Sequence, residues 1–205
     1  MARAKRIFPE TPSQTAGPYV HIGCMPNYSG IEGIYAVDPG CRMLDTNTSG
    51  KRISIYGHIY DGEGVPLSDA VIETWQADAA GLYPSPQDTR GEADKTFSGW
   101  GRKPCDPQTG EFRFDTIKPG QVPYSDGRLQ APHITLWIVA RGINVALHTR
   151  LYFDDESAAN ALDPILAQLD PEGRVETLIA NTRGDSDYRF DIHLQGADET
   201  VFFDM

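Results

Sequence analysis

Cysteine is scarce in this chain, and long apolar runs are absent from it. The three cysteines, Cys24, Cys41 and Cys105, are an odd number without C-x-x-C spacing, so neither a disulfide framework nor a zinc motif is expected. No stretch approaches the roughly 20 apolar residues that cross a bilayer. The basic first residues are not followed by the apolar core of a signal peptide. We therefore expect free thiols and a cytoplasmic protein.

Basic residues are also fewer than acidic ones. The chain has 18 Lys and Arg and 29 Asp and Glu, which gives a formal net charge of −11. A field of that sign repels phosphate backbones and anionic lipid, which makes nucleic acid and membrane surfaces poor candidates as partners. An anionic small molecule would need a local arginine or a basic partner chain. The GxGxxG and P-loop patterns are missing as well, so no flavin or nicotinamide cofactor is indicated.

The residues that are present favour β structure. Twenty Gly and fifteen Pro among 205 residues indicate many turns. The first fifty residues contain repeated prolines and no sustained apolar period, whereas short segments rich in β-branched residues begin at Ile53. Strands are predicted over residues 53–60, 69–78, 111–117, 133–140, 145–153, 175–180, 188–194 and 200–203.

The remaining segments are predicted as connections and one helix. Residues 79–104 lack an apolar period and are expected to form a loop, while residues 141–144 make a hairpin-sized connection between two strands. A helix is expected after Asp154 or Asp155 as N-cap, and Pro164 limits its extension.

These elements predict an all-β protein with one or two short helices. We expect an antiparallel β-sandwich of the prealbumin-like type, because many short strands separated by turn signals suit that architecture. The chain is interpreted as a single domain, residues 1–205. Its β-sandwich core covers residues 51–205, and the long irregular N-terminal arm, residues 1–50, needs another surface to pack on.

Several motifs carry a more specific signal. The hairpin of residues 56–76 ends in Trp75-Gln76-Ala77-Asp78, and the further motifs are Gly81-Leu82-Tyr83, Thr116-Ile117-Lys118-Pro119-Gly120, Ala131-Pro132-His133-Ile134 and Leu151-Tyr152-Phe153-Asp154. In this order and spacing the chain resembles the intradiol ring-cleavage dioxygenases, which open catechols between their two hydroxyl-bearing carbons. The arm from Pro9 to Tyr19 and the end from Glu199 to Asp204 are similar to the α chain of the protocatechuate-cleaving branch, so the resemblance covers nearly the whole chain.

The iron ligands of that family are mostly missing here. The family holds a ferric ion with two tyrosines and two histidines, the latter as His-x-His on one face of a strand. This chain has His133-Ile134-Thr135 in that place, Val122 where a tyrosine follows the Lys-Pro-Gly turn, and no tyrosine in residues 84–99. His133 alone matches a ligand, so we expect no metal site in this chain and interpret His133 as a buried, hydrogen-bonded histidine.

The resemblance implies a division of labour between two homologous chains. It implies an α–β hetero-oligomer in which the partner β chain holds Fe(3+). With O₂, that complex would cleave protocatechuate to 3-carboxy-cis,cis-muconate. This chain would have no catalytic residue of its own and would be inactive alone.

The resemblance also assigns the substrate-binding residues Tyr19, Gly17 and Arg141 to this chain. The plainer interpretation of Arg141 is a strand-end arginine paired with Asp154 or Asp155. Arg150 is expected to support packing.

Two other hypotheses remain open at this point. One is a self-sufficient dioxygenase with a rebuilt ligand set, using His133, Tyr124 and His148 as candidates. The other is a prealbumin-like module that binds a small molecule without catalysis, and it depends only on the hairpin of residues 56–76. Metal analysis and activity of the isolated chain would separate them.

Overall fold

The structure, a computed structural model, describes residues 14–17, 19–169 and 173–204. Its strands are β1 Arg52–Tyr60, β2 Val71–Trp75, β3 Trp100–Pro104, β4 Glu111–Ile117, β5 Val122–Pro123, β6 Leu129–Gln130, β7 His133–Val139, β8 Leu147–Phe153, β9 Ile179–Arg183, β10 Asp187–Arg189 and β11 Ile192–His193. Its helical segments are α1 Val20–Cys24, η1 Asp154–Glu156, α2 Ser157–Asn160, α3 Leu166–Leu169 and η3 Val175–Leu178. None of the helices in the described residues has the length and apolar character that a membrane crossing requires.

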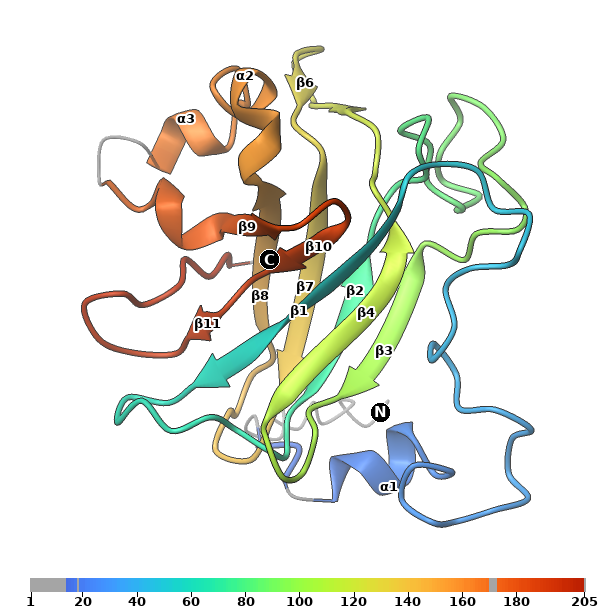
Figure 1. Cartoon of the computed structure of the whole chain (residues 1–205), viewed down its shortest axis with the longest axis vertical. Helices are drawn as coiled ribbons and strands as arrows, with labels where there is room; N and C mark the ends of the chain where they lie inside the picture. Colours follow the sequence, from blue (N-terminus) through green and yellow to red (C-terminus); the bar gives the residue numbers. More distant parts are fainter. Residues whose placement is uncertain (1–13, 18, 170–172, 205) are drawn as a thin grey trace, which may run out of the picture.

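One sheet dominates the fold. Within the described residues it has nine strands in the order β11-β1-β10-β9-β8-β7-β2-β3, with β4 paired to β1. The sheet curves so that β1 and β4 lie in front of β2, β7 and β8 (Figure 1). Side chains of both parts, among them Ile55, Phe112, Leu136 and Leu151, share one buried core. The mostly β prediction is therefore confirmed, and the sheet is nearly barrel-shaped.

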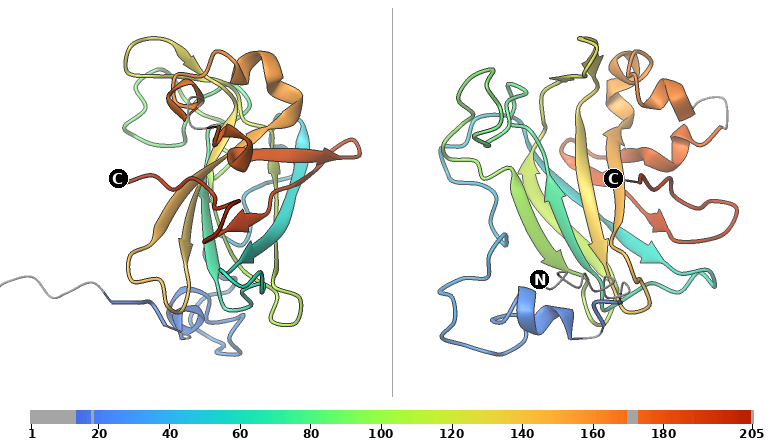
Figure 2. Two further views of the ribbon diagram at one scale, coloured as in Figure 1. Left: turned by 90° about the vertical axis from the view of Figure 1, so that its left-hand side faces the viewer. Right: turned by 180° about the vertical axis from the view of Figure 1, so that it is seen from behind.

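The central position of the apolar strand at residues 133–140 is confirmed. β7 pairs with β2 on one side and with β8 on the other, and it has buried side chains on both faces. The turned views of Figure 2 show β7 and β8 running along the length of the molecule. The register of the β7–β8 pair places His133 opposite Tyr152 and Thr135 opposite Arg150.

The predicted antiparallel arrangement applies to only part of the sheet. The pairs β8–β9, β1–β10 and β1–β11 are parallel. A parallel pair needs a long crossover between its strands, and the helical segment between β8 and β9 supplies one. This crossover covers the end of the sheet near β6 (Figure 1). The prealbumin-like sandwich arrangement stays a prediction.

Several local predictions near the C-terminal end were also wrong. Residues 175–180 begin as the 3-10 helix η3, residues 188–194 are interrupted between β10 and β11, and residues 200–203 form no strand. The interruption has a visible cause, because the side chain of Asp191 accepts the hydrogen bond of the His58 backbone N–H at 3.1 Å. The loop predicted over residues 79–104 contains the short strand β3.

The expected cap of the helix after residue 155 is also absent. No side-chain hydrogen bond caps α2. Asp154 instead accepts hydrogen bonds from the backbone N–H and the hydroxyl of Thr182 on β9, so its carboxylate joins β9 to the end of β8.

The described part of the N-terminal arm has little regular structure apart from α1, and it packs on the chain's own core. The Asp38 carboxylate accepts the backbone N–H groups of Asn27 and Tyr28 at 2.9 and 2.8 Å, which closes a loop within the arm. Arg102 on β3 donates to the carbonyl of Cys24 at 3.0 Å. Cys24, Cys41 and Cys105 are free thiols. The matching residues Pro9 to Ser13 lie outside the described residues.

Candidate functional site

Thr15 fastens the arm to the connection between β7 and β8. Its hydroxyl donates to the carbonyl oxygen of Ala140 at 3.0 Å and accepts the backbone N–H of Gly142 at 3.0 Å. Gly17 follows with a φ of +74°, a left-handed conformation that glycine adopts without strain. The helix α1 then starts directly after Tyr19. One threonine therefore brings two distant segments of the sequence together.

The three predicted substrate-binding residues lie around this junction. Tyr19 is 75% exposed and extends from the surface. A Cβ on Gly17 would meet no atom of this chain within 4 Å, so the space beside it is open. The Arg141 side chain is 69% exposed and its Nε lies 3.2 Å from Asp69 Oδ2. The pairing of Arg141 with Asp154 or Asp155 was wrong, because those residues follow the other end of β8.

This junction lies at one end of the molecule, far from His133. Arg141 follows the last residue of β7, whereas His133 is its first residue. A strand rises about 3.3 Å per residue, so the two ends of β7 are roughly 20 Å apart. Figure 1 shows α1 and β6 at these opposite ends. The three predicted residues and His133 therefore lie at opposite ends of the molecule (Figure 1).

His133 lines a cavity of about 390 Å³ at the β6 end. The lining residues are Trp75, Tyr83, Ser85, Gln87, Asp88, Arg90, Val122, Pro123, Gln130, His133, Thr135 and Arg150. Two turns meet to form it: Gly81 has a φ of +80°, and a Cβ there would stand 2.1 Å from the carbonyl oxygen of Gln121. This close approach requires glycine and brings Tyr83 and Val122 to the same cavity.

The interpretation of His133 as a buried, hydrogen-bonded histidine is confirmed. It is 4% exposed, and its Nδ1 lies 2.8 Å from the carbonyl oxygen of Ala131. A carbonyl only accepts, so Nδ1 carries the proton and Nε2 keeps its lone pair. Burial, together with the charge of Arg150, lowers the pKa of His133 to about 4. The ring is therefore neutral at neutral pH.

The donor set of this cavity does not fit a ferric ion. Thr135, at the second position on the face of His133, offers a neutral hydroxyl, and Val122 offers no donor at all. Arg150 stands directly across from Thr135, and a fixed guanidinium charge repels a metal cation. Among the described residues, no group of three His, Cys, Asp or Glu side chains could hold a metal.

The rebuilt ligand set of the self-sufficient alternative is not brought together. His148 pairs with Trp137, four residues along β7 from His133, which corresponds to about 13 Å of strand. Tyr124 follows β5 and is not among the residues that line the cavity. These positions give a ferric ion no common centre, which argues against that hypothesis.

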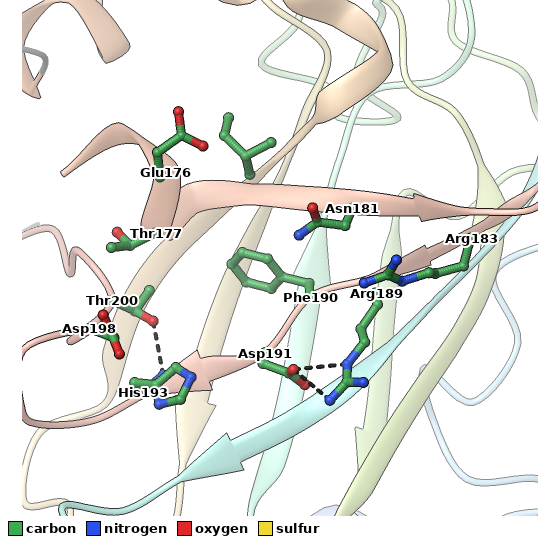
Figure 3. Close-up of a pocket in the computed structure, with 11 residues that line it drawn as sticks. Glu176, Thr177, Asn181, Arg183, Arg189, Phe190, Asp191, His193, Asp198 and Thr200 are labelled. Carbon is green, nitrogen blue, oxygen red and sulfur yellow. Dashed lines mark hydrogen bonds and ion pairs between the residues drawn. The ribbon is translucent and has the colours of Figure 1, made fainter. Parts of the chain in front are cut away.

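A second cavity, of about 330 Å³, lies over β9, β10 and β11 (Figure 3). Arg189 faces it and is neutralised by Asp191, with Nη2 2.8 Å from Oδ2. The backbone N–H of His193 donates to the Thr200 hydroxyl at 2.9 Å, and the His193 ring stacks on Tyr60. The predicted residues Gly17, Tyr19 and Arg141 do not line this cavity. Some of the charged side chains that do line it, such as Arg189 and Asp191, pair with each other.

Known proteins that are similar to this chain identify its family. The model of the family described as "Dioxygenase" matches residues 26–196. The protocatechuate 3,4-dioxygenase alpha chain of Pseudomonas putida is 45% identical over 202 residues, covering 97% of this chain and 98% of that one. The chain belongs to the intradiol ring-cleavage dioxygenase family.

Other intradiol relatives agree with this assignment. The protocatechuate 3,4-dioxygenase beta chain of Burkholderia cepacia is 34% identical over 161 residues, 74% of this chain and 67% of that one. Among solved structures, the dioxygenase domain of a carbohydrate-binding fusion protein from Streptomyces sp. SirexAA-E superposes with a TM-score of 0.55 at 25% identity, covering 80% of this chain and 94% of that chain. The family resemblance in the sequence is thus confirmed.

One functional candidate on this intradiol scaffold was missed. Arg150 was expected to support packing, but it lines the cavity of His133. The strand register that follows from the predicted connection at residues 141–144 already indicated the position of Arg150. A symmetric hairpin around that connection places residue 150 opposite residue 135, on the face of His133.

Proposed function

We propose that this chain is the α-type subunit of a two-chain intradiol dioxygenase that cleaves protocatechuate with O₂. The homologous β chain holds the Fe(3+), and this chain supplies substrate-binding groups to the partner's site. One observation carries the proposal. Gly17, Tyr19 and Arg141 gather on an open end of the molecule, at the opposite end of β7 from the chain's own cavity.

The chemistry of the three residues suits an aromatic acid. Arg141 keeps its charge at any physiological pH and can bind a carboxylate through two parallel hydrogen bonds. In its ion pair with Asp69 the Arg141 side chain is 69% exposed, whereas the Asp69 side chain is only 21% exposed, so the guanidinium faces solvent while it is paired. Tyr19 offers a ring wall and a hydroxyl, while Gly17 leaves room for a close approach of the substrate.

An exposed apolar surface next to these residues supports packing of the arm on the partner chain. Most of the large apolar side chains that are exposed in the described part of the chain lie between residues 19 and 37. They are Tyr19, Ile22, Tyr28, Ile31, Ile34, Tyr35 and Val37. Exposed large apolar side chains that gather in one segment of a chain are typical of a surface that another protein covers. We name these seven residues the arm patch and assign it to the contact with the β chain.

Reconstitution tests the subunit role. The purified chain should contain no iron in elemental analysis and should consume no O₂ with protocatechuate. Its complex with an iron-bearing β chain should contain iron and should consume O₂ with protocatechuate. The β chain alone serves as the control. Iron and activity in this chain alone would refute the proposal, as would a complex no more active than the β chain.

Substitutions in the complex test the three site residues. Tyr19→Phe and Arg141→Ala should each raise KM for protocatechuate or lower kcat without loss of iron, and Arg141→Ala should act more strongly, roughly tenfold or more, because it removes a charge-assisted contact. Arg128→Ala, which removes an exposed cation paired with Asp126, is the matched control. Wild-type kinetics in both variants would reject the site and leave the subunit role standing.

A cytoplasmic location belongs to the same proposal. The free thiols of Cys24 and Cys41 are partly accessible and suit a reducing compartment.

A further inference from the structure

The cavity of His133 contains a positive charge that forms no ion pair within the described residues. Arg150 Nη1 donates to Gln130 Oε1 at 2.8 Å and lies 3.3 Å from the Tyr152 hydroxyl. Burial raises the pKa of Tyr152 to about 12, so both partners are neutral. No carboxylate among the described residues pairs with Arg150, although the chain is strongly acidic. A charged group left without a counter-ion in a cavity indicates an anionic ligand.

The other charged groups near the cavity have partners of their own. Arg90 and Asp88 neutralise each other at 2.5 Å. Asp163 lies behind the wall, where its carboxylate accepts the backbone N–H groups of Ala131, Ile165 and Leu166. Arg150 therefore remains the single unbalanced charge among the described groups that line the cavity.

The rest of the wall selects a flat molecule with a hydroxyl group. Trp75 and Tyr83 stack with ring centroids 5.7 Å apart and nearly parallel planes, which gives the cavity a broad aromatic side. The Nδ1 of His133 is committed to a carbonyl, so only its Nε2 lone pair can accept a hydrogen bond from a ligand. A volume of about 390 Å³ admits a single-ring compound.

We propose that this cavity binds a hydroxylated aromatic carboxylate without catalysis, with the carboxylate on Arg150 and the hydroxyl donating to His133. The position that holds a metal in other family members would thus have become an organic-anion site in this chain. The cavity lies about 20 Å along β7 from the site proposed for the partner's substrate. The cavity would therefore be a second binding site, separate from that substrate site.

A titration of the full chain without its partner tests this inference independently of the subunit role. The probe is 4-hydroxybenzoate, followed by the tryptophan fluorescence to which Trp75 contributes. Saturable binding is expected. Benzoate, which lacks the hydroxyl, should bind several-fold more weakly, and phenol, which lacks the carboxylate, roughly tenfold or more weakly.

Variants separate the cavity from other surfaces. Arg150→Gln should weaken 4-hydroxybenzoate roughly tenfold or more, whereas Arg128→Gln, at an exposed ion pair, should bind like the wild type. Thr135→Leu keeps the charge but fills the cavity and should also abolish binding, with far-UV circular dichroism as the folding control. Equal affinities for 4-hydroxybenzoate and phenol, no saturable binding by the wild type, or a folded Arg150→Gln protein with wild-type affinity would each overturn the proposal.

Discussion

At the scale of single residues, burial sets the chemistry of His133. A buried imidazolium is costly, and the nearby guanidinium of Arg150 makes it costlier. Both effects lower the pKa of His133 to about 4 from its ordinary value near 6.5. The histidine that matches a metal ligand is therefore held neutral by its surroundings, with its Nδ1 proton directed to Ala131.

This shift predicts a loss of stability in mild acid. Between about pH 6.5 and 4 the unfolded chain binds a proton at His133 and the folded chain does not. The free energy that neutral His133 contributes to folding is therefore complete above pH 6.5 and is lost as the pH falls. From pH 7 to pH 5 the free energy of unfolding should drop by about 2 kcal/mol more in the wild type than in His133→Gln. Urea unfolding at the two pH values measures it, and equal drops would contradict it.

At the scale of elements, the hairpin of β7 and β8 positions both candidate sites. Its connection carries Arg141 and holds the arm through Thr15. Its register places Arg150 across from Thr135 at the other end. A slip of this register by one residue would place His133 and Arg150 on opposite faces of the sheet, so both candidate sites depend on one pairing.

The attachment of the arm to this hairpin is open to a direct test. Thr15→Val keeps the shape of the side chain but removes the acceptor for the Gly142 N–H and the donor to Ala140. Since each such bond contributes about 1 kcal/mol, hydrogen exchange of the Gly142 amide should accelerate roughly fivefold to tenfold. Thr15→Ser retains the hydroxyl and should exchange like the wild type. Unchanged exchange in the valine variant would show that Thr15 does not hold the arm.

At the scale of the whole molecule, polarity is distributed unevenly. The chain has a net charge of −11, yet the arm patch, defined above as seven exposed apolar side chains between residues 19 and 37, lies at one end. Net charge keeps chains apart, whereas exposed apolar surface favours association at one place. The combination suits a subunit that joins a specific partner.

Footprinting can locate the partner on this surface. Carbene labelling of Ile34, Tyr35 and Val37 should fall several-fold when the β chain is added, because apolar side chains in an interface core are removed from water. Leu162 is 76% exposed and lies near α2, at the other end of the molecule, so its labelling should stay constant. Protection of Leu162 without protection of the arm patch would place the interface elsewhere.

The sequence by itself determined the family, the mostly β fold, the central strand at residues 133–140 and the missing iron ligands. Those features depend on residue type, short-range spacing and alternation, which are local properties of a chain. It did not determine the parallel pairs, because pairing between distant strands is decided by the crossover that links them. The interruption at Asp191 depends likewise on a contact with distant His58.

Only the tertiary structure decided how the candidate residues are grouped. Gly17 and Tyr19 are distant in sequence from Arg141 and come to the same end of the molecule because Thr15 binds the β7–β8 connection. His133 and Arg150 meet through strand register, and the two turns joined at Gly81 enclose them. The physical reason is that burial and electrostatic surroundings arise from contacts across the fold. The type of a residue therefore indicates its chemistry, while its neighbours in space decide how that chemistry can be used.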